Sequence, residues 1–353
     1  MPDKSPFKFL DAFEKNDVSS FFGRSWETET LFKKTFESNL ILLYGLSGTG
    51  KTSLVRCGLH NMFADTDWLP LFIRRERNII ASLQHHIFQA AYEKKSLKDQ
   101  PIARQVYSLY LDYYKPVYLI FDQFEELFIQ GSREEAGRFF WLLAELLQSK
   151  VQVKIMLIMR EEYLADLDRF EKIVPSLFDN RFRVERMRTE DIYEVIARST
   201  DHFDITIEKP ETEIISGIIE RIRNDRGQVD LTNLQVYLDQ LYRDDLKRRG
   251  SHDRPIRFDH DLLEKTGRLG HVLSRFLDEQ LERINNELLK RNSGARDLAL
   301  KVLARLVTNE GTKQTGYRNI IIEALSDEQH LSQNDITYCI ERLHDLRIIR
   351  FLE

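Results

Sequence analysis

A glycine-rich segment near residue 50 has the residue types and the spacing to bind a polyphosphate. The segment runs Gly45-Leu-Ser-Gly-Thr-Gly-Lys51-Thr52 and fits the pattern G-x-x-x-x-G-K-[ST]. Glycines let the backbone curl until several N–H groups point inward at phosphate oxygens, and the helix that follows adds its positive N-terminal end. We expect Lys51 to reach the β- and γ-phosphates and the Thr52 hydroxyl to hold Mg²⁺. The predicted nucleotide-binding residues of this segment are Gly45, Ser47, Gly48, Thr49, Gly50, Lys51, Thr52 and Ser53.

A second acidic group is needed to hold the magnesium ion, and the run "VYLIFD" (117–122) places Asp122 at the end of an apolar strand. The sequence "DQFEE" continues directly from it, so Glu125 and Glu126 are candidates for orienting or deprotonating the water beside the γ-phosphate. We prefer Glu126 for this role. The alternative is that these acids only cap the next helix. Thr52 and Asp122 together form the predicted metal site.

Five apolar runs in the first 190 residues read as the strands that must position these groups. The runs are "LILLY", "WLPLFIR" (68–74), "VYLIFD" (117–122), "VKIMLIM" (153–159) and "FRVERM" (182–187). Helical patterns separate them, and this alternation predicts an α/β fold with a parallel sheet and helices on both faces. Because "WLPLFIR" intervenes between the glycine-rich segment and Asp122, we expect the additional-strand class of P-loop ATPases, in which the two nucleotide-binding strands are not adjacent.

After Met187 the sequence predicts helices and no strand until "RIIRFL" (347–352). Three helices followed by a strand are the order of a winged-helix domain. Since a wing is a hairpin, we expect the natural protein to continue past Glu353. The predicted domains are an N-terminal segment (1–38), a P-loop ATPase domain (39–188), a lid-like α-helical bundle (189–290) and a winged-helix domain (291–353).

The bulk composition excludes several classes of protein. The 353 residues are 42% hydrophobic and 31% charged, which describes a globular protein of more than one domain. The formal net charge of −5 disfavours non-specific nucleic-acid binding, although a local basic patch would be compatible with it. Only Cys57 and Cys339 are present, which predicts no disulfide framework and no zinc site. No run of 18 apolar residues occurs, so we expect a cytoplasmic protein without a membrane partner.

Five motifs in order resemble the bacterial STAND ATPases, and most closely the novel STAND group of these AAA+-related signal-transduction proteins. The motifs are "PFKFLDAF" (6–13), "FFGRSWE" (21–27), the glycine-rich segment, "LIFDQFEELF" (119–128) and "MLIMREEYLADL" (156–167). The resemblance is specific over residues 6 to about 190. From there to residue 353 it covers only the order of the parts, a helical bundle and then a winged helix.

The resemblance implies roles for further residues. Gly23 and Arg24 match the GR motif and, with Phe22, would border the adenine; the alternative is a turn that only packs on the sheet. Arg160 matches the sensor arginine that reads the γ-phosphate, and its alternative is a surface salt bridge to a neighbouring glutamate. Arg181 stands where AAA+ relatives place an arginine finger that reaches into a neighbouring copy, although several arginines share that stretch.

Two departures from the family pattern lie in the C-terminal half. The stretch "GQVDLTNLQVYLDQLY" has no proline where many relatives have a Gly-x-Pro turn that contacts the nucleotide, which puts that contact in doubt. The "LHDL" sequence (343–346) is superficially similar to a histidine motif that senses ADP in related receptors. It precedes the expected wing strand instead of lying in the wing, so we interpret His344 as a surface or core residue.

The resemblance implies an ATP/ADP-controlled switch with Mg²⁺ as its metal. ADP would keep the helical domains folded over the ATPase, and ATP would favour an open form that self-associates, with slow hydrolysis as the reset. It also implies signalling, in bacteria commonly antiviral defence, and a C-terminal sensor region or partner proteins outside this chain. Two alternatives stay open: an AAA+-like DNA-binding initiator or transcription regulator that uses its winged helix, and a scaffold that binds nucleotide without hydrolysing it.

Overall fold

The computed structural model describes residues 5–92, 99–149, 151–249, 254–291, 297–307, 316–329, 332–346 and 348–349. The chain divides into two compact units, residues 1–267 and residues 268–353. The first unit contains the glycine-rich segment and all five strands predicted for the sheet. The helical bundle that was predicted for 189–290 contributes elements to both units.

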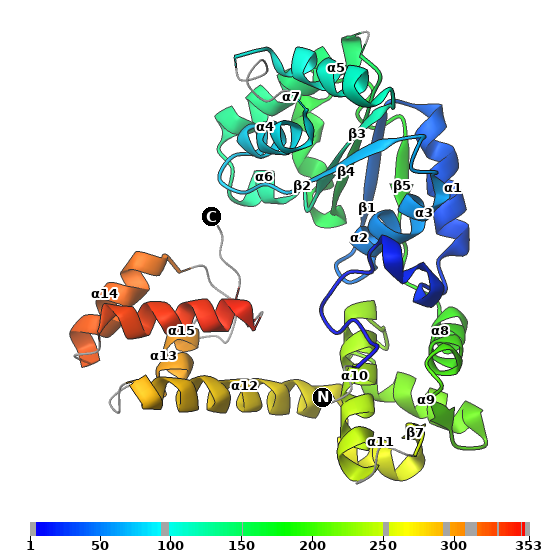
Figure 1. Ribbon diagram of the computed structural model, residues 1–353, viewed down its shortest axis with the longest axis vertical. Helices are drawn as coiled ribbons and strands as arrows, with labels where there is room; N and C mark the ends of the chain where they lie inside the picture. The colour runs from blue at the N-terminus through cyan, green and yellow to red at the C-terminus, as the bar shows by residue number, and fades with distance from the viewer. Residues whose placement is uncertain are drawn as a thin grey trace. The chain divides into compact units, whose positions relative to one another are not determined.

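A five-stranded parallel sheet forms the centre of the first unit (Figure 1). Its strands are β1 (Leu40–Gly45), β2 (Leu69–Ile73), β3 (Val117–Asp122), β4 (Val153–Arg160) and β5 (Arg181–Arg183). Their order in the sheet is β2-β3-β4-β1-β5, and every neighbouring pair is parallel. Strand β4 therefore separates β1 from β3, which confirms the predicted α/β fold and the non-adjacent strands of the additional-strand class.

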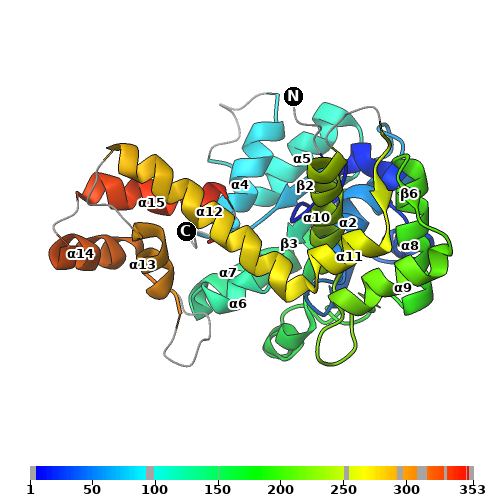
Figure 2. The same cartoon turned by 90° about the horizontal axis from the view of Figure 1, so that it is seen from below.

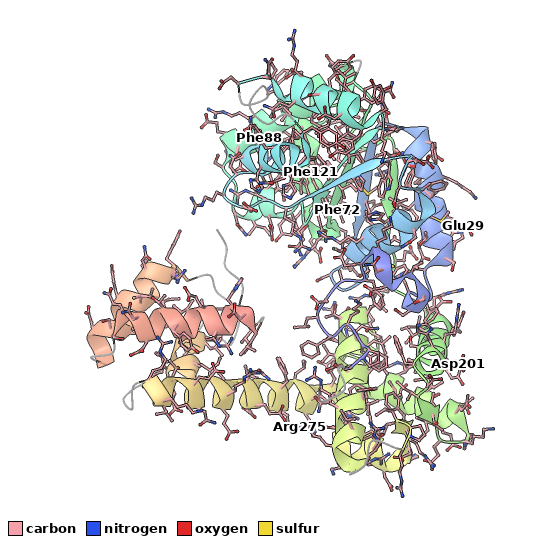
Figure 3. The ribbon with its side chains drawn as sticks, in the orientation of Figure 1. Glu29, Phe72, Phe88, Phe121, Asp201 and Arg275 are labelled. Carbon is pink, nitrogen blue, oxygen red and sulfur yellow. The ribbon has the colours of Figure 1, made fainter. Side chains whose placement is uncertain are left out.

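Helices cover both faces of this sheet, because β3 and β4 are apolar on both sides. The helices α4 (Ile79–Ala90), α5 (Ile102–Tyr113) and α7 (Arg133–Gln148) lie on one face (Figure 1). Phe121 of β3 is buried in the core on that side, and Phe88 of α4 packs against the same core (Figure 3). The opposite face packs on α1 (Ser25–Glu37) and on the helix that follows the glycine-rich segment.

Short helical segments carry the remaining turns of the ATPase domain. They are η1 (Lys15–Ser20), α2 (Lys51–Ser53), the π-helical η2 (Leu54–Leu59), α3 (His60–Met62), α6 (Glu126–Ile129), η3 (Glu161–Asp166) and η4 (Asp168–Phe170). The segments α2, η2 and α3 follow one another without a break, so one continuous helix leads away from the glycine-rich turn. Segment α6 begins four residues after the end of β3, where the acidic sequence "DQFEE" lies.

Helices make up most of the rest of the first unit. They are α8 (Thr189–His202), α9 (Glu211–Ile222), α10 (Leu231–Arg249) and α11 (His260–Thr266). The expectation that strands are absent between Met187 and residue 347 was wrong, because β6 (Thr206–Ile207) and β7 (Arg257–Phe258) pair in parallel. Two residues are too few to show the alternation by which a strand is found in a sequence. Helix α10 begins beside α2 in both views (Figures 1 and 2).

The second unit consists of helices around its own apolar core. They are α12 (Leu269–Arg291), α13 (Leu298–Ala304), α14 (Arg318–Gln329) and α15 (Gln333–Asp345). The last three correspond to the helices predicted for a winged-helix domain. Most of the predicted wing strand "RIIRFL" lies outside the described residues, so the winged helix stays a prediction. No helix in the described parts of the chain is both long and apolar enough to cross a bilayer.

Both cysteines are free and buried, as the composition predicted. Cys57 lies in η2 of the first unit and Cys339 in α15 of the second. Burial raises the pKa of each thiol to about 12. Both side chains therefore act as small core residues.

Candidate nucleotide site

The glycine-rich segment forms a tight turn between β1 and α2, and three of its residues must be glycine. An added Cβ on Gly45 would lie 2.3 Å from the carbonyl oxygen of Val184. Gly48 and Gly50 have φ angles of +75° and +84°, in the left-handed region that glycine adopts without strain. Thr49 is buried between them, and its hydroxyl donates to the Leu46 carbonyl oxygen at 3.0 Å. These constraints define the conformation of the turn.

The Lys51 ammonium group lies within this turn. Its Nζ donates to the carbonyl oxygens of Gly45 at 2.8 Å and Leu46 at 2.7 Å. Burial lowers the pKa of Lys51, and the carboxylate of Glu125 opposes that shift. Because phosphate oxygens are stronger acceptors for an ammonium than carbonyls are, a bound phosphate would compete for these donors. Ser47 is exposed at the tip of the turn, and the Ser53 hydroxyl accepts the Phe13 backbone N–H at 3.1 Å.

Thr52 and Asp122 meet across the sheet edge, as the sequence predicted for a metal site. The Thr52 hydroxyl donates to Oδ1 of Asp122 at 2.9 Å, and Asp122 is only 2% exposed. Among the residues that the structure describes, no three His, Cys, Asp or Glu side chains gather as a metal site. A hydroxyl and one carboxylate fit Mg²⁺, which keeps several waters and takes other ligands from nucleotide phosphates. These two oxygens are the groups that would hold the ion.

Sequence reasoning missed Arg74, which also contacts Asp122. Arg74 follows β2 directly, and its Nε and Nη2 donate to Oδ2 of Asp122 at 3.0 and 2.7 Å. The signal was present in the sequence, because parallel strands end at the same edge of a sheet and "WLPLFIR" ends on this arginine. What the sequence could not supply was the strand order, which places β2 next to β3.

Of the two candidate acids after Asp122, the structure brings Glu125 to the site. Glu125 is buried, and its Oε1 lies 3.1 Å from Nε of Arg160 while Oε2 accepts the Arg160 backbone N–H at 3.3 Å. Glu126 is the partly exposed first residue of α6. Arg160 ends β4 and is 49% exposed, so its guanidinium can still reach a ligand. The preference for Glu126 stays a prediction, and Glu125 stays a candidate with a described contact to Arg160.

Arg24 of the GR motif forms a hydrogen bond with the glycine-rich turn. Its Nη2 donates to the carbonyl oxygens of Thr49 at 2.9 Å and of Glu185 at 3.0 Å, while Nη1 pairs with Glu27. The side chain is only 4% exposed, and its Nε has no hydrogen-bond partner. Gly23 must be a glycine, since its φ is +77° and an added Cβ would lie 2.6 Å from Cγ2 of Val195. Arg24 thus links the glycine-rich turn to the segment after β5.

A cavity opens beside the turn, and four separate segments line it. It is lined by aromatic and aliphatic side chains from the N-terminal segment, α8 and α10, together with the glycines of the turn. The lining includes Phe13, Phe21, Phe22, Arg24, Met187, Val195 and Leu231. Phe22 is further held by Arg198, whose guanidinium carbon lies 4.4 Å from the ring centroid. A flat apolar group next to a phosphate cradle, such as a nucleobase, is what this cavity fits.

The start of α10 rests directly on the turn, although its sequence lacks the expected proline. The Leu231 backbone N–H donates to the Gly48 carbonyl oxygen at 3.2 Å. Oδ1 of Asp230 accepts from Nη1 of Arg186 at 2.6 Å and would lie 2.9 Å from a Cβ added to Gly48. This stretch therefore contacts the turn through a backbone hydrogen bond and through the packing of Asp230 against Gly48. The exposed Arg181 on β5 has no such contact described, and its role as an arginine finger stays a prediction.

Comparisons with known proteins agree with this geometry. The family model described as novel STAND NTPase 1 matches residues 6–352. A search of curated proteins found no match. A Walker-type ATPase of Pyrococcus abyssi is 18% identical, with a TM-score of 0.51 over 96% of this chain and 93% of that one.

Two ORC proteins of Aeropyrum pernix share the fold as well. The ORC1 protein in complex with DNA is 14% identical, with a TM-score of 0.52 over 93% of this chain and 84% of that one. The ADP form of the ORC2 protein is 14% identical, with a TM-score of 0.53 over 97% and 99%. At this identity the likeness shows the P-loop ATPase fold alone. The family match covers nearly the whole chain, and the chain belongs to the novel STAND NTPase 1 family.

Proposed function

We propose that this chain binds ATP and ADP with Mg²⁺ at the Gly45–Thr52 turn and acts as a nucleotide-operated switch that self-associates when ATP is bound. The observation that carries the proposal is the contact between the start of α10 and the turn, Leu231 N–H to Gly48 O at 3.2 Å. Because α10 contacts both the glycine-rich turn and the cavity beside it, a ligand bound there would affect the position of this helix. The helical part of the first unit is therefore in direct contact with the turn that would hold the nucleotide.

A switch requires a contact that ATP makes and ADP does not. Arg160 supplies one, because its half-exposed guanidinium holds Glu125 at 3.1 Å, close to Lys51. A γ-phosphate adds negative charge at this place and competes with the glutamate for the arginine. ATP would then release Glu125 to orient a water molecule for hydrolysis, while ADP would leave the pair closed. When bound, Mg²⁺ would polarise the phosphate oxygens.

Three substitutions test this proposal, each measured for nucleotide retention, phosphate release and particle mass with ADP, ATP and a slow ATP analogue. Lys51→Ala should lose nucleotide binding. Glu125→Gln should bind ATP, hydrolyse it at least tenfold more slowly and accumulate as a larger particle. Glu126→Gln should show the same slow hydrolysis and larger particle only if Glu126, as the sequence predicts, is the residue that activates the water.

Glu134→Gln is the matched control, since Glu134 lies exposed on α7 and pairs with the exposed Arg138. It should behave as the wild type in all three assays. Unchanged nucleotide retention in Lys51→Ala, or unchanged mass in both Glu125→Gln and Glu126→Gln, would contradict the switch.

Self-association suggests a role for Arg181. It is exposed on β5, one of the two edge strands of the sheet, where a second copy could meet it. Arg181→Ala should then lower phosphate release at high protein concentration and leave it unchanged at low concentration. An equal effect at both concentrations would remove the arginine-finger role. The family further suggests that the switch serves signalling, including bacterial antiviral defence.

DNA binding is a second candidate, favoured by the fold shared with a protein solved in complex with DNA. The charges of α15 argue against it. Arg342 donates to both carboxylate oxygens of Glu287 at 2.9 and 3.1 Å, and Arg318 pairs with Glu341 at 2.8 Å. Cations already neutralised in this way release few counterions from DNA. Fluorescence anisotropy with labelled duplex at about 50 and 200 mM salt would decide it; tight, salt-dependent binding would favour this candidate.

A further inference from the structure

Arg74 contacts the predicted metal-binding carboxylate in a way that the proposed switch does not use. Oδ1 of Asp122 accepts from the Thr52 hydroxyl, and Oδ2 accepts from two nitrogens of Arg74. Each carboxylate oxygen thus has its own partner. Because the Thr52 side is where a magnesium ion would bind, Arg74 can stay on Oδ2 when the ion arrives.

The charge of Asp122 requires such a partner. A carboxylate that is only 2% exposed is strongly disfavoured in its ionised form unless a cation or hydrogen-bond donors compensate it. Lys51 donates to backbone carbonyls, and the Thr52 hydroxyl is uncharged. The cation in hydrogen-bond contact with Asp122 in the described structure is therefore Arg74, at 2.7 Å.

The backbone next to Arg74 is fixed by a second, buried ion pair. Arg75 donates through Nε and Nη2 to the two oxygens of Glu135, at 2.9 Å each, and both side chains are nearly buried. Oε1 of Glu135 also accepts the Ile79 backbone N–H at 2.8 Å. These bonds hold the turn between β2 and α4 against α7. Arg74 is therefore presented to Asp122 from a rigid segment, although 41% of its side chain is exposed.

We propose that Arg74 is a positioning residue that holds Asp122 toward Thr52 and neutralises it, so that a nucleotide can enter the site before Mg²⁺ does. The inference rests on the proposed nucleotide site. Without Arg74, an uncompensated carboxylate faces the incoming polyphosphate, and only a metal ion can relieve the repulsion. Arg74 therefore sets how strongly nucleotide affinity depends on magnesium.

The test compares the dissociation constant for ADP and for ATP in EDTA and in saturating Mg²⁺, by isothermal titration calorimetry. In Arg74→Ala, the affinity for nucleotide in EDTA should fall by about tenfold or more. A repulsion of this size is expected between one uncompensated carboxylate and a nearby polyanion at an effective dielectric constant of about 20. With Mg²⁺ the loss should be about threefold or less. For each nucleotide, the diagnostic quantity is the ratio of the dissociation constant in EDTA to the dissociation constant in Mg²⁺. The loss of affinity in EDTA should be larger for ATP than for ADP.

Three variants separate charge from structure. Arg74→Lys keeps the charge, so its affinity in EDTA should stay within about threefold of the wild type. The double variant Arg74→Ala/Asp122→Asn removes the carboxylate with its partner and should regain the affinity in EDTA that Arg74→Ala loses. Arg77→Ala is the matched control, because Arg77 is an exposed neighbour that contributes only its backbone carbonyl to the turn. Circular dichroism establishes that each variant is folded.

The inference would be overturned if Arg74→Ala had the wild-type ratio of the dissociation constants in EDTA and in Mg²⁺, or if the double variant did not regain affinity in EDTA. Neither result would affect the proposed function. If Arg74→Ala does not fold, Arg74→Lys and the double variant still decide the matter by their ratios. A wild-type chain that binds neither nucleotide in either buffer would overturn the proposed function, and this inference with it.

Discussion

The substitution Gly48→Ala tests whether α10 closes on the nucleotide-binding turn as the structure has it. A residue other than glycine at φ +75° costs about 1–2 kcal/mol. The added Cβ would also lie 2.9 Å from Oδ1 of Asp230, closer than real contacts allow. Asp230 can move away only by giving up its bond to Arg186, a partly exposed ion pair worth about 0.5–1 kcal/mol. The variant should therefore lose about 1.5–3 kcal/mol of stability.

Thermal unfolding followed by tryptophan fluorescence is the suitable assay, because Trp26, Trp68 and Trp141 all lie in the first unit. A loss of this size should lower the melting temperature of that unit by about 3–12 °C. Gly137→Ala is the control, since nothing lies within 4 Å of the Cβ it adds to α7. It should stabilise the unit by about 0.5–1 kcal/mol.

The double variant Gly48→Ala/Asp230→Ala separates the backbone cost from the clash. Without the carboxylate the added methyl group has room, so the two substitutions together should cost about 0.5–1 kcal/mol less than their sum. The cost of the left-handed φ should remain. A Gly48→Ala protein as stable as the wild type, or strict additivity in the double variant, would refute the contact between Asp230 and the turn.

Two further predictions concern buried groups elsewhere in the two units. Glu135→Gln weakens the buried pair with Arg75 and leaves an uncompensated charge, so it should lower the free energy of unfolding in urea by about 3–5 kcal/mol. Glu134→Gln changes an exposed pair and should lower it by under about 1 kcal/mol. Equal losses in the two variants would contradict the burial of the Arg75–Glu135 pair. Because burial raises the pKa of Cys57 and of Cys339 to about 12, both thiols stay protonated and should resist a thiol reagent at pH 8 until their unit unfolds. Single-cysteine variants titrated with urea check this, and rapid labelling of either thiol in the native protein would contradict it.

Much of the sheet was predictable because its strands are apolar runs set apart by helical patterns. The glycine-rich turn was equally clear, since its glycines are required by positive φ angles and by close contacts with the backbone. The pairing of Thr52 with Asp122 followed from the rule that parallel strands end at one edge. Local sequence carries all of this information.

What the sequence did not reveal depends on contacts between distant segments. The role of Arg74 needed the strand order, which places β2 beside β3 and its terminal arginine beside Asp122. The choice between Glu125 and Glu126 depended on which side chain the start of α6 turns toward β4. The contact of α10 with Gly48 uses a backbone N–H, which no side-chain pattern in the sequence reveals. The doubt about a nucleotide contact, raised by the missing proline, stays a prediction.

The most direct test of the central claim is a crystal structure of the chain with Mg²⁺ and a slowly hydrolysed ATP analogue. The account predicts the triphosphate on the backbone N–H groups between Gly45 and Thr52, with Lys51 turned from the carbonyls to the phosphates and the metal between Thr52 and Asp122. A nucleotide bound elsewhere, or a turn left empty at saturating analogue, would contradict it.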